Sequence, residues 1–376
     1  MNWLSTVIFI GTFVTAITAV PLYGYYVGYG AYEWVMFFLF LYFSGTAITA
    51  GYHRLWSHNT YEAHPAVKLW FAFWGAASIQ NSILIWSSGH RRHHRFVDDK
   101  EKDPYSINRG FWFAHMGWMV RHYPSSDIDF SNVRDLQKDK VVMLQHNRYA
   151  MFVFISTVVF PLFLGWLNGD ILGTFLLAGV LRLVLNHHFT FFINSLCHMW
   201  GKRPYTDTNT ARDNGVLAVF TYGEGYHNFH HYFQNDYRNG VRWWQFDPTK
   251  WIINGLSRIK LAKNLRRVPD FKIREAIIKM QFAQAQSKIE STSNNQETWR
   301  EIIEKEYNEF KQTLDEWTVL RGEWMTKQRE QINKTRDNLR VRFESSTIAS
   351  RFKELEYALR LQQARLAQLN RQFASM

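Results

Sequence analysis

Four long apolar stretches limit what this chain can fold into. They run over residues 3–23, 33–50, 149–167 and 171–192. An α-helix of about 20 apolar residues crosses the roughly 30 Å hydrocarbon layer of a bilayer. The first stretch has no positively charged start and the second follows after a short loop, so we interpret it as a retained span rather than a secretion signal. The sequence therefore predicts an all-α membrane protein with four transmembrane helices.

The positions of Lys and Arg set the expected orientation of these spans. The loops PLYGYYVGYGAY and GWLNGD contain neither residue, whereas the segment between the second and third spans, and everything after the fourth, is basic. Both termini and the long middle segment are therefore expected on the cytoplasmic side. The apolar segment 66–86 must then return to the side it left, and we expect it to lie along or partly in the interface. A fifth span is the alternative, and it would separate the histidine groups.

Composition excludes some classes of site without choosing a function. The 376 residues carry a net charge of +12 and one cysteine, Cys197. A single cysteine excludes an intrachain disulfide framework and a cysteine-based zinc finger. The basic surplus suits nucleic acid, anionic lipid or an acidic ligand.

Most histidines fall into three groups. The segment HRLWSH holds His53 and His58, HRRHH holds His90, His93 and His94, and HNFHH holds His227, His230 and His231. The spacing H-x-x-H-H puts its imidazoles on one helical face, whereas two residues five apart lie about 140° apart on a helix, so HRLWSH is expected to straddle a helix end. All groups lie on one predicted side of the membrane. Neutral imidazole is the commonest metal ligand, so the pattern predicts a metal site.

The number of histidines favours two ions. One zinc needs three or four protein ligands, and eight or nine histidines exceed that need. An all-nitrogen site with open positions beside a membrane fits iron that activates dioxygen. The sequence lacks the set of Glu-x-x-His pairs found in carboxylate-rich di-iron bundles, so this would be a different type of centre.

With these motifs the sequence resembles the integral-membrane fatty-acid desaturases that act on acyl-CoA and insert a cis double bond at carbon 9. The resemblance covers about residues 35–250 and rests on TAGYHRLWSH, HRRHH, DP followed by NRGFWFAHMGW, NSLCH and GEGYHNFHH, in the family's order. It implies four transmembrane helices under a cytoplasmic helical cap that holds two non-haem irons. The membrane domain would comprise residues 1–268, with the cap formed by 51–148 and 193–268.

The resemblance also implies a set of ligands. NSLCH matches the family's N-S-x-x-H, so His198 would be a ninth ligand and Asn194 would hold a water near the second iron. One iron would take His53, His58, His90, His94 and His230, and the other His93, His198, His227 and His231. Zinc can replace iron in purified protein, so a metal found there would not identify the native one. Carboxylates that could orient the imidazoles are Glu224, Asp98, Asp99 and Asp103, with solvated acids as the alternative.

Five residues are candidates for contacting an acyl chain. Phe37 and Leu41, one turn apart on the second span, match the region that closes the family's substrate tunnel, with ordinary packing or lipid-facing side chains as the alternative. Gln80, Asn81 and Thr190 are polar groups in apolar surroundings, where polar side chains are costly unless they are used, and they are candidates for lining the bend of the tunnel.

Cations are needed for the phosphates of CoA. Arg121 and Arg109 are the candidates, and Arg91, Arg92 and Arg95 could contribute, with a solvated or headgroup-facing surface as the alternative. Animal acyl-CoA desaturases carry an Arg-Asp pair directly before the second histidine group, where this chain has Ser-Gly at 88–89. An acyl-lipid or acyl-carrier substrate is therefore the alternative to acyl-CoA.

The implied reaction is oxygen-dependent desaturation of a saturated fatty acyl thioester. Electrons must come from a separate ferredoxin, rubredoxin or cytochrome, because the sequence has no haem-binding H-P-G-G and no iron–sulfur cysteines. A di-iron hydroxylase of a lipid or alkane is the nearest alternative. A membrane metal-binding or scaffold protein, whose tail carries the function, is the alternative from another class.

Residues 269–376 are expected to form a helical, coiled-coil-like tail. Apolar residues recur there at heptad spacing: Ile303, Phe310, Trp317 and Trp324 with Tyr307 and Leu314 between them, then Leu359, Leu366 and Phe373 with Leu355 and Leu369. This pattern is typical of a coiled coil or helical hairpin, and its tryptophans are interpreted as core rather than as a nucleic-acid-binding surface. Such a tail could join two copies of the chain, dock on the cap or hold the electron donor.

The expected location is the bacterial inner membrane, since the amino terminus is short and the sequence has no endoplasmic-reticulum retrieval pattern. The expected partners are the acyl thioester, membrane lipid and the electron donor. No nucleic acid is expected.

Overall fold

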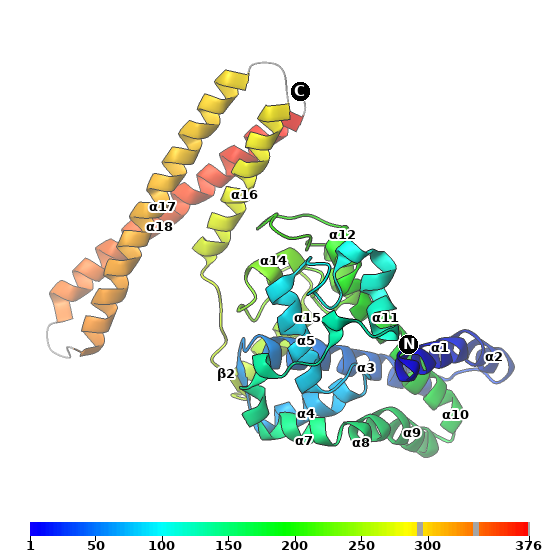
Figure 1. The fold of residues 1–376 in the computed structure, drawn as a ribbon. Coiled ribbons are helices and arrows are strands. Elements are labelled where there is room, and N and C mark those ends of the chain that lie inside the picture. Colours follow the sequence, from blue (N-terminus) through cyan, green and yellow to red (C-terminus); the bar gives the residue numbers. More distant parts are fainter. Residues whose placement is uncertain (292–295, 334–337, 375–376) are drawn as a thin grey trace. The chain divides into compact units, whose positions relative to one another are not determined.

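The computed structural model describes residues 1–291, 296–333 and 338–374, and they form two compact units. The first unit contains residues 1–203 and 208–267, and the second contains residues 204–207 and 268–376. Helices dominate both units (Figure 1). In the described part of the chain, the only sheet is the antiparallel pair of β1 (Glu62–Ala63) and β2 (Ala262–Lys263). The predicted all-α class is confirmed.

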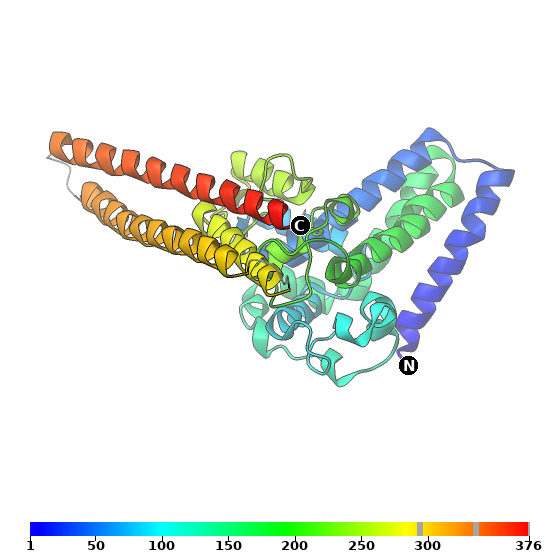
Figure 2. The same ribbon diagram turned by 90° about the horizontal axis from the view of Figure 1, so that it is seen from above.

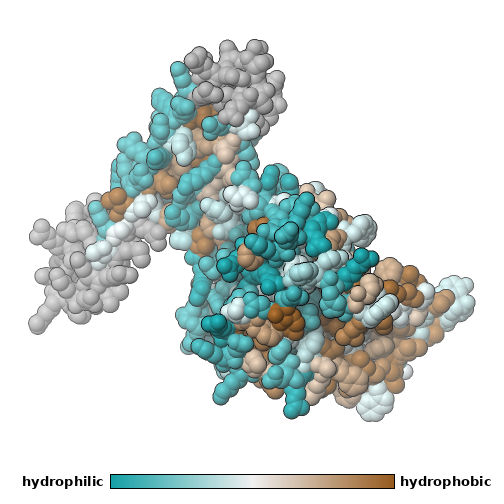
Figure 3. All heavy atoms as spheres, in the orientation of Figure 1, coloured by the Kyte–Doolittle hydropathy of each residue, from teal (hydrophilic) through white to brown (hydrophobic). Residues whose placement is uncertain are grey.

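Four helices of the first unit are long and apolar enough to cross a membrane, as predicted. They are Trp3–Tyr26, Ala31–Ser57, Tyr149–Asn168 and Ile171–His198. Apolar side chains cover the surface over α1, α2, α9 and α10 (Figure 3), as expected of helices in contact with lipid. The second and fourth spans extend beyond their predicted ends, so that they carry His53 and His198 of the centre described below.

Each span is built from more than one helical segment. The first contains α1 (Trp3–Ile17) and α2 (Ala19–Tyr26), and the second contains α3 (Ala31–Thr46) and the π-helical segment η1 (Ala47–Ser57). The third contains α8 (Tyr149–Phe154), the π-helical η7 (Ile155–Val159) and α9 (Phe160–Asn168). The fourth contains α10 (Ile171–Thr174), the π-helical η8 (Phe175–Leu181), α11 (Arg182–Asn194) and the start of α12 (Leu196–Met199).

Shorter helices make up the rest of this unit. They are α4 (Pro65–Ala76), α5 (Ile83–Phe96), the π-helical η3 (Phe113–Gly117), α6 (Trp118–Val120), α7 (Lys140–Asn147), α13 (Gly215–Phe220), α14 (His227–Tyr232) and α15 (Pro248–Arg258). Single 3-10 turns lie at Ile107–Arg109, Pro124–Ser126, Ser131–Val133 and Leu136–Lys138.

The apolar segment 66–86 is not among the four candidate spans, which agrees with the expected return to the side it left. It forms the short α4 and then turns at Asn81, whose φ of 72° is left-handed. Two polar side chains of the fourth span hold this turn. Arg182 Nη1 donates to the carbonyl of Ala77 at 2.6 Å, and His187 Nε2 lies 2.7 Å from the carbonyl of Ser78. A buried polar residue is costly unless its hydrogen bonds are satisfied, so these contacts fix the segment against the span.

The second unit contains α16 (Asp270–Ser291), α17 (Gln296–Asn333) and α18 (Asn338–Ala374), which run alongside one another (Figure 2). Their buried core is Phe271, Ile278, Phe282, Ala285, Ile303, Phe310, Trp317, Leu355, Leu359 and Leu366. Most heptad positions of the sequence pattern belong to this core, and Leu314 packs against it. Tyr307 is partly exposed and contacts the ring of Phe282. The side chains of Trp324, Leu369 and Phe373 lie outside the described residues.

Candidate metal centre

Nine histidines of the first unit gather into two groups. The first contains His53, His58, His90, His94 and His230, and the second contains His93, His198, His227 and His231. Within each group one ring nitrogen of every residue lies within 4.8 Å of the others. These groups have the same members as the two ligand sets that the family resemblance implies. Seven of the side chains are buried and two, His94 and His231, are half-buried.

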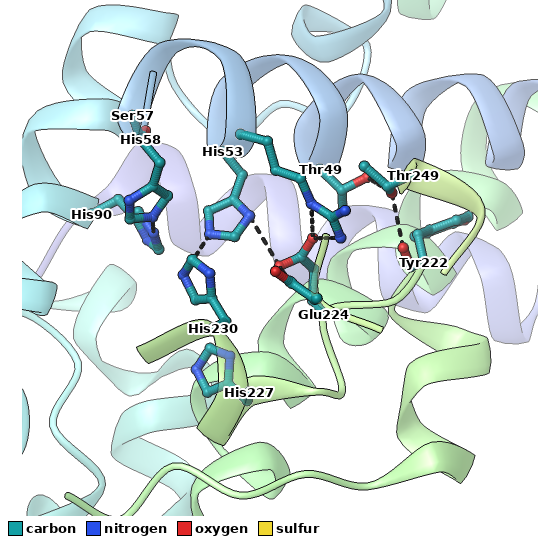
Figure 4. Close-up of polar contacts among 12 residues, drawn as sticks. Thr49, His53, Ser57, His58, His90, Tyr222, Glu224, His227, His230 and Thr249 are labelled. Atoms are coloured by element: carbon teal, nitrogen blue, oxygen red, sulfur yellow. Dashed lines mark hydrogen bonds and ion pairs between the residues drawn. The ribbon is translucent and has the colours of Figure 1, made fainter. Parts of the chain in front are cut away.

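The rings of the first group meet through their Nε2 atoms. His58 Nε2 lies 2.8 Å from His90 Nε2, and His230 Nε2 lies 3.0 Å from His53 Nε2 and 2.9 Å from His94 Nε2. Figure 4 shows the rings of His53 and His230 directed toward each other. One ring nitrogen has either a hydrogen or a lone pair, so hydrogen bonding cannot explain how His230 Nε2 faces two others.

The second group shows the same convergence. His227 Nε2 lies 3.1 Å from the Nε2 atoms of both His198 and His231, and His93 Nε2 lies 3.3 Å from His231 Nε2. Two nitrogens bound to one ion at about 2.1 Å and at right angles lie about 3.0 Å apart. The spacing in both groups therefore fits imidazoles that share an ion, and the site can hold two metal ions.

Local helix geometry brings these side chains together. The hydroxyl of Ser82 caps the start of α5, and the spacing H-x-x-H-H then places His90 and His94 in the first group and His93 in the second. The second span changes to π-helical winding, so that the N–H of His58 donates to the carbonyl of His53, five residues earlier, at 3.1 Å. In an α-helix these two side chains would point in different directions, whereas the wider π turn directs both toward the same side of the helix. His58 is also the C-cap of this helix, at the predicted helix end.

Carboxylates lie beside Nδ1 of two histidines, on the side of the ring away from the converging Nε2 atoms. His53 Nδ1 lies 2.9 Å from Glu224 Oε2, and His93 Nδ1 lies 2.9 Å from Asp103 Oδ1. An imidazole with its hydrogen on Nδ1 donates to the carboxylate and turns the Nε2 lone pair toward the metal. His198 Nδ1 lies 2.8 Å from the hydroxyl of Thr210, which donates to Asp98 at 2.6 Å.

Asp99, the fourth acid proposed from the sequence, does not contact a histidine of the centre. Its carboxylate accepts the backbone N–H groups of Glu101 and Lys102 at an exposed turn. Its alternative interpretation as a solvated acid therefore holds.

A buried arginine supports Glu224. Arg54 Nη2 lies 2.9 Å from Glu224 Oε1, and Arg54 Nη1 donates to Asp247 Oδ2 at 3.1 Å and to the carbonyl of Tyr237 at 2.8 Å. Burial alone would raise the pKa of Glu224, but the nearby His53 and Arg54 hold it below its ordinary value. Glu224 is therefore a carboxylate at neutral pH. No sequence motif indicated that Arg54 or Asp247 belongs to this network.

Burial also keeps six of the nine imidazoles neutral. It lowers the pKa well below the ordinary value in His58, His90, His94, His227, His230 and His231, and the neighbouring histidines lower it further. Neutral imidazole is the form that binds metal.

Two arginines interleaved with the histidines of α5 are structural. Arg91 donates to the carbonyls of Ser57 and Trp56 at 2.9 and 2.8 Å and pairs with Asp135 at 2.7 Å. Arg92 donates to the carbonyls of residues 125 and 127. These guanidinium groups tie α5 to the end of the second span and to a loop, so the interpretation as phosphate-binding groups is not supported for them. Arg95 is exposed and lies over the ring of its neighbour Phe96.

Two polar residues proposed to line the acyl tunnel lie together beside the centre. Gln80 Nε2 donates to the hydroxyl of Thr190 at 3.0 Å, and Trp86 Nε1 donates to Gln80 Oε1 at 3.4 Å. The ring of Trp86 stacks on His90 at a centroid distance of 4.9 Å. Asn81 is exposed, whereas Gln80, Trp86 and Thr190 are half-buried. Trp86 was not identified from the sequence.

The other proposed substrate residues lie elsewhere in this unit. Phe37 is buried in a cluster between spans, and Leu41 packs against that cluster. The guanidinium of Arg109 lies over the rings of Phe113 and Tyr123, with its central carbon 3.7 and 4.4 Å from their centroids. Arg121 is exposed. Asn194, the residue proposed to hold a water, ends α11 four residues before His198.

The fold and the site together define an integral membrane protein whose nine-histidine centre can hold two metal ions. A family model described as fatty acid desaturase matches residues 32–259. A probable acyl-CoA desaturase of Schizosaccharomyces pombe is 43% identical over 280 residues, which are 74% of this chain and 57% of that protein. Acyl-CoA desaturase 1 of Saccharomyces cerevisiae is 38% identical over 288 residues, covering 75% and 55%. The stearoyl-CoA desaturase of Bos taurus is 34% identical over 242 residues, covering 63% and 67%.

The chain belongs to the fatty acid desaturase family, as its motifs predicted. It spans a little over half the length of the two yeast relatives. These relatives are eukaryotic, and the bacterial inner membrane stays a prediction.

Proposed function

We propose that this chain is an oxygen-dependent acyl desaturase that inserts a cis double bond at carbon 9 of a saturated acyl chain carried as a CoA thioester. The observation that carries the proposal is the pair of histidine groups, whose Nε2 atoms are spaced as ligands of two ions. Family membership and the names of the acyl-CoA and stearoyl-CoA relatives support the substrate class.

The donor set fits two irons. Nine imidazole nitrogens, with carboxylates behind two of the rings, suit a metal that must keep open positions for dioxygen. Two irons bound there would supply the dioxygen chemistry that removes one hydrogen from each of two adjacent methylenes. The overall reaction consumes one dioxygen, two electrons and two protons, and releases the alkene and two waters. The two electrons come from an external one-electron carrier of the ferredoxin, rubredoxin or cytochrome type.

The residues of the chain bind and orient the substrate. Gln80 and Thr190 are hydrogen-bonded to each other, and Gln80 also accepts from Trp86, whose ring stacks on His90. These two polar side chains would fix a bend in the acyl chain beside the first group. Holding the reacting carbons in one position is a large contribution that a protein can make to such a reaction. Phe37 and Leu41 would limit the length of the buried tail.

The cationic ends of Arg109 and Arg121 would contact the CoA phosphates. Stacking covers the face of the Arg109 guanidinium, which leaves its in-plane N–H groups for phosphate oxygens. The distribution of Lys and Arg supports placing this centre and both termini on the cytoplasmic side.

The test is to express the chain with a ferredoxin and its reductase in a host that lacks unsaturated-fatty-acid synthesis, and to profile the fatty acids. We expect cis-9 monoenes, which disappear with His93→Ala and persist with His122→Ala, an exposed histidine outside both groups. Hydroxylated chains would instead indicate a hydroxylase. Monoenes that persist in His93→Ala would contradict the assigned centre.

A further inference from the structure

The loop GVRWWQF, residues 240–246, and the start of α15 expose large aromatic side chains. Trp243 is 88% exposed, Trp244 59%, Trp251 47% and Phe246 37%. The rings of Phe246 and Trp251 contact each other at a centroid distance of 5.5 Å. Four exposed aromatic side chains within nine residues, 243–251, are unfavourable in water and indicate a surface that another phase or molecule covers.

The fold holds this loop in one conformation. Lys250 Nζ donates to the carbonyls of Gly240, Arg242 and Gln245 at 2.6, 2.7 and 3.0 Å. The buried carboxylate of Asp247 accepts the N–H of Gly240 at 3.0 Å. The buried ammonium of Lys250 and the buried carboxylate of Asp247 therefore both hold the backbone of the loop. In the conformation that they stabilise, the tryptophans of the loop are exposed.

Contacts with the second span hold the start of α15 against it. The hydroxyl of Thr249 lies 2.7 Å from that of Thr49 in the span and donates to the carbonyl of Tyr222 at 2.8 Å (Figure 4). Tyr222 in turn donates to the carbonyl of Leu41 at 3.0 Å, deeper in the span, and its ring packs where Gly45 has no side chain. Thr49 lies eight residues before the end of this span, within its π-helical part. The start of α15 therefore lies beside the span.

A second exposed apolar face, on α13, adjoins the fourth span. On α13, Val216, Val219 and Phe220 are 56%, 50% and 45% exposed. The ring of Phe220 contacts that of Phe189 in the fourth span at 5.4 Å. Exposed apolar side chains thus precede and follow Tyr222, whose hydroxyl binds the second span, and one of them, Phe220, contacts the fourth span.

We propose that loop 240–246, Trp251 and the exposed face of α13 insert into the bilayer surface on the side of the histidine centre. Tryptophan is the residue most typical of the headgroup boundary, because its ring is apolar and its N–H can reach polar groups. Arg242 lies over the ring of Trp244 at 5.8 Å, where it can pair with a lipid phosphate. The partner is a phospholipid surface, and the inference is independent of the reaction that the centre performs.

The sole cysteine makes a direct test simple, because Cys197 is buried and an introduced cysteine can be labelled selectively. Trp243→Cys, Trp244→Cys and Val216→Cys in the full chain are labelled with an environment-sensitive fluorophore and reconstituted in phosphatidylcholine–phosphatidylglycerol nanodiscs. The matched control is Glu101→Cys in an exposed polar turn. Spin-labelled lipid should quench the three test positions several-fold more than position 101, and iodide should show the reverse order.

Iodide quenching at positions 243 and 244 equal to that at 101, with no quenching by spin-labelled lipid, would overturn the proposal and leave a soluble protein as the partner of this surface. Val216 lies outside the loop, so its label reports on the same surface even where the tryptophan substitutions alter the loop. Each labelled protein is used only where it retains the thermal melting temperature of the parent.

Discussion

The Nδ1 atom of His53 lies 2.9 Å from Oε2 of Glu224, although the two residues are 171 positions apart in the sequence. The same carboxylate binds Arg54 through its other oxygen. One side chain therefore sets the tautomer of a candidate ligand and neutralises a buried cation.

Glu224→Gln should weaken metal binding about 10- to 100-fold, because an amide keeps the shape but loses the charge that orients His53. Competition with a chelator, followed by metal analysis, measures the change. Asp99→Asn is the matched control, since Asp99 contacts only exposed backbone N–H groups. Equal metal retention in Glu224→Gln and Asp99→Asn would refute the role of the carboxylate.

Arg91→Met and Arg121→Met should affect different quantities. Arg91 has buried carbonyl partners, so its loss should lower the free energy of unfolding by about 1–3 kcal/mol and leave the KM for acyl-CoA unchanged. Arg121 is exposed and should show a raised KM with an unchanged melting temperature. Thermal denaturation and steady-state kinetics with acyl-CoA distinguish the two. A raised KM in Arg91→Met would indicate that this arginine contacts the substrate.

Thr190→Val should lower kcat by up to about 100-fold, or shift the position of the double bond, while two metal ions are retained. The reason is that valine keeps the volume but removes the acceptor for Gln80. Product analysis by mass spectrometry and metal analysis on the same sample separate the two effects. Asn81→Gly, which tolerates the left-handed φ, serves as the control and should leave both unchanged.

Acidification should destabilise the metal-free protein. The buried histidines have pKa values lowered in the folded state, whereas in the unfolded chain their pKa is about 6.5. Below that pH the unfolded chain takes up protons that the folded chain does not, so stability is fully present above pH ~6.5 and falls as the pH is lowered. Denaturation of chelator-treated protein from pH 8 to pH 5 measures this. A free energy of unfolding that rises toward pH 5 would contradict the neutral state of the cluster.

The sequence by itself determined the membrane architecture. The length and apolarity of a span are local properties of the sequence, and they need only match the thickness of the bilayer. The histidine motifs were local too, and the family resemblance indicated how they divide between two ions. Only the tertiary structure decided how the rings are supported. Arg54 and Asp247 are paired with partners far along the chain, Arg91 binds backbone carbonyls, and a π-helical turn aligns His53 with His58. Such contacts depend on which buried groups need a hydrogen-bond partner once helices have packed, and residue spacing does not contain that information.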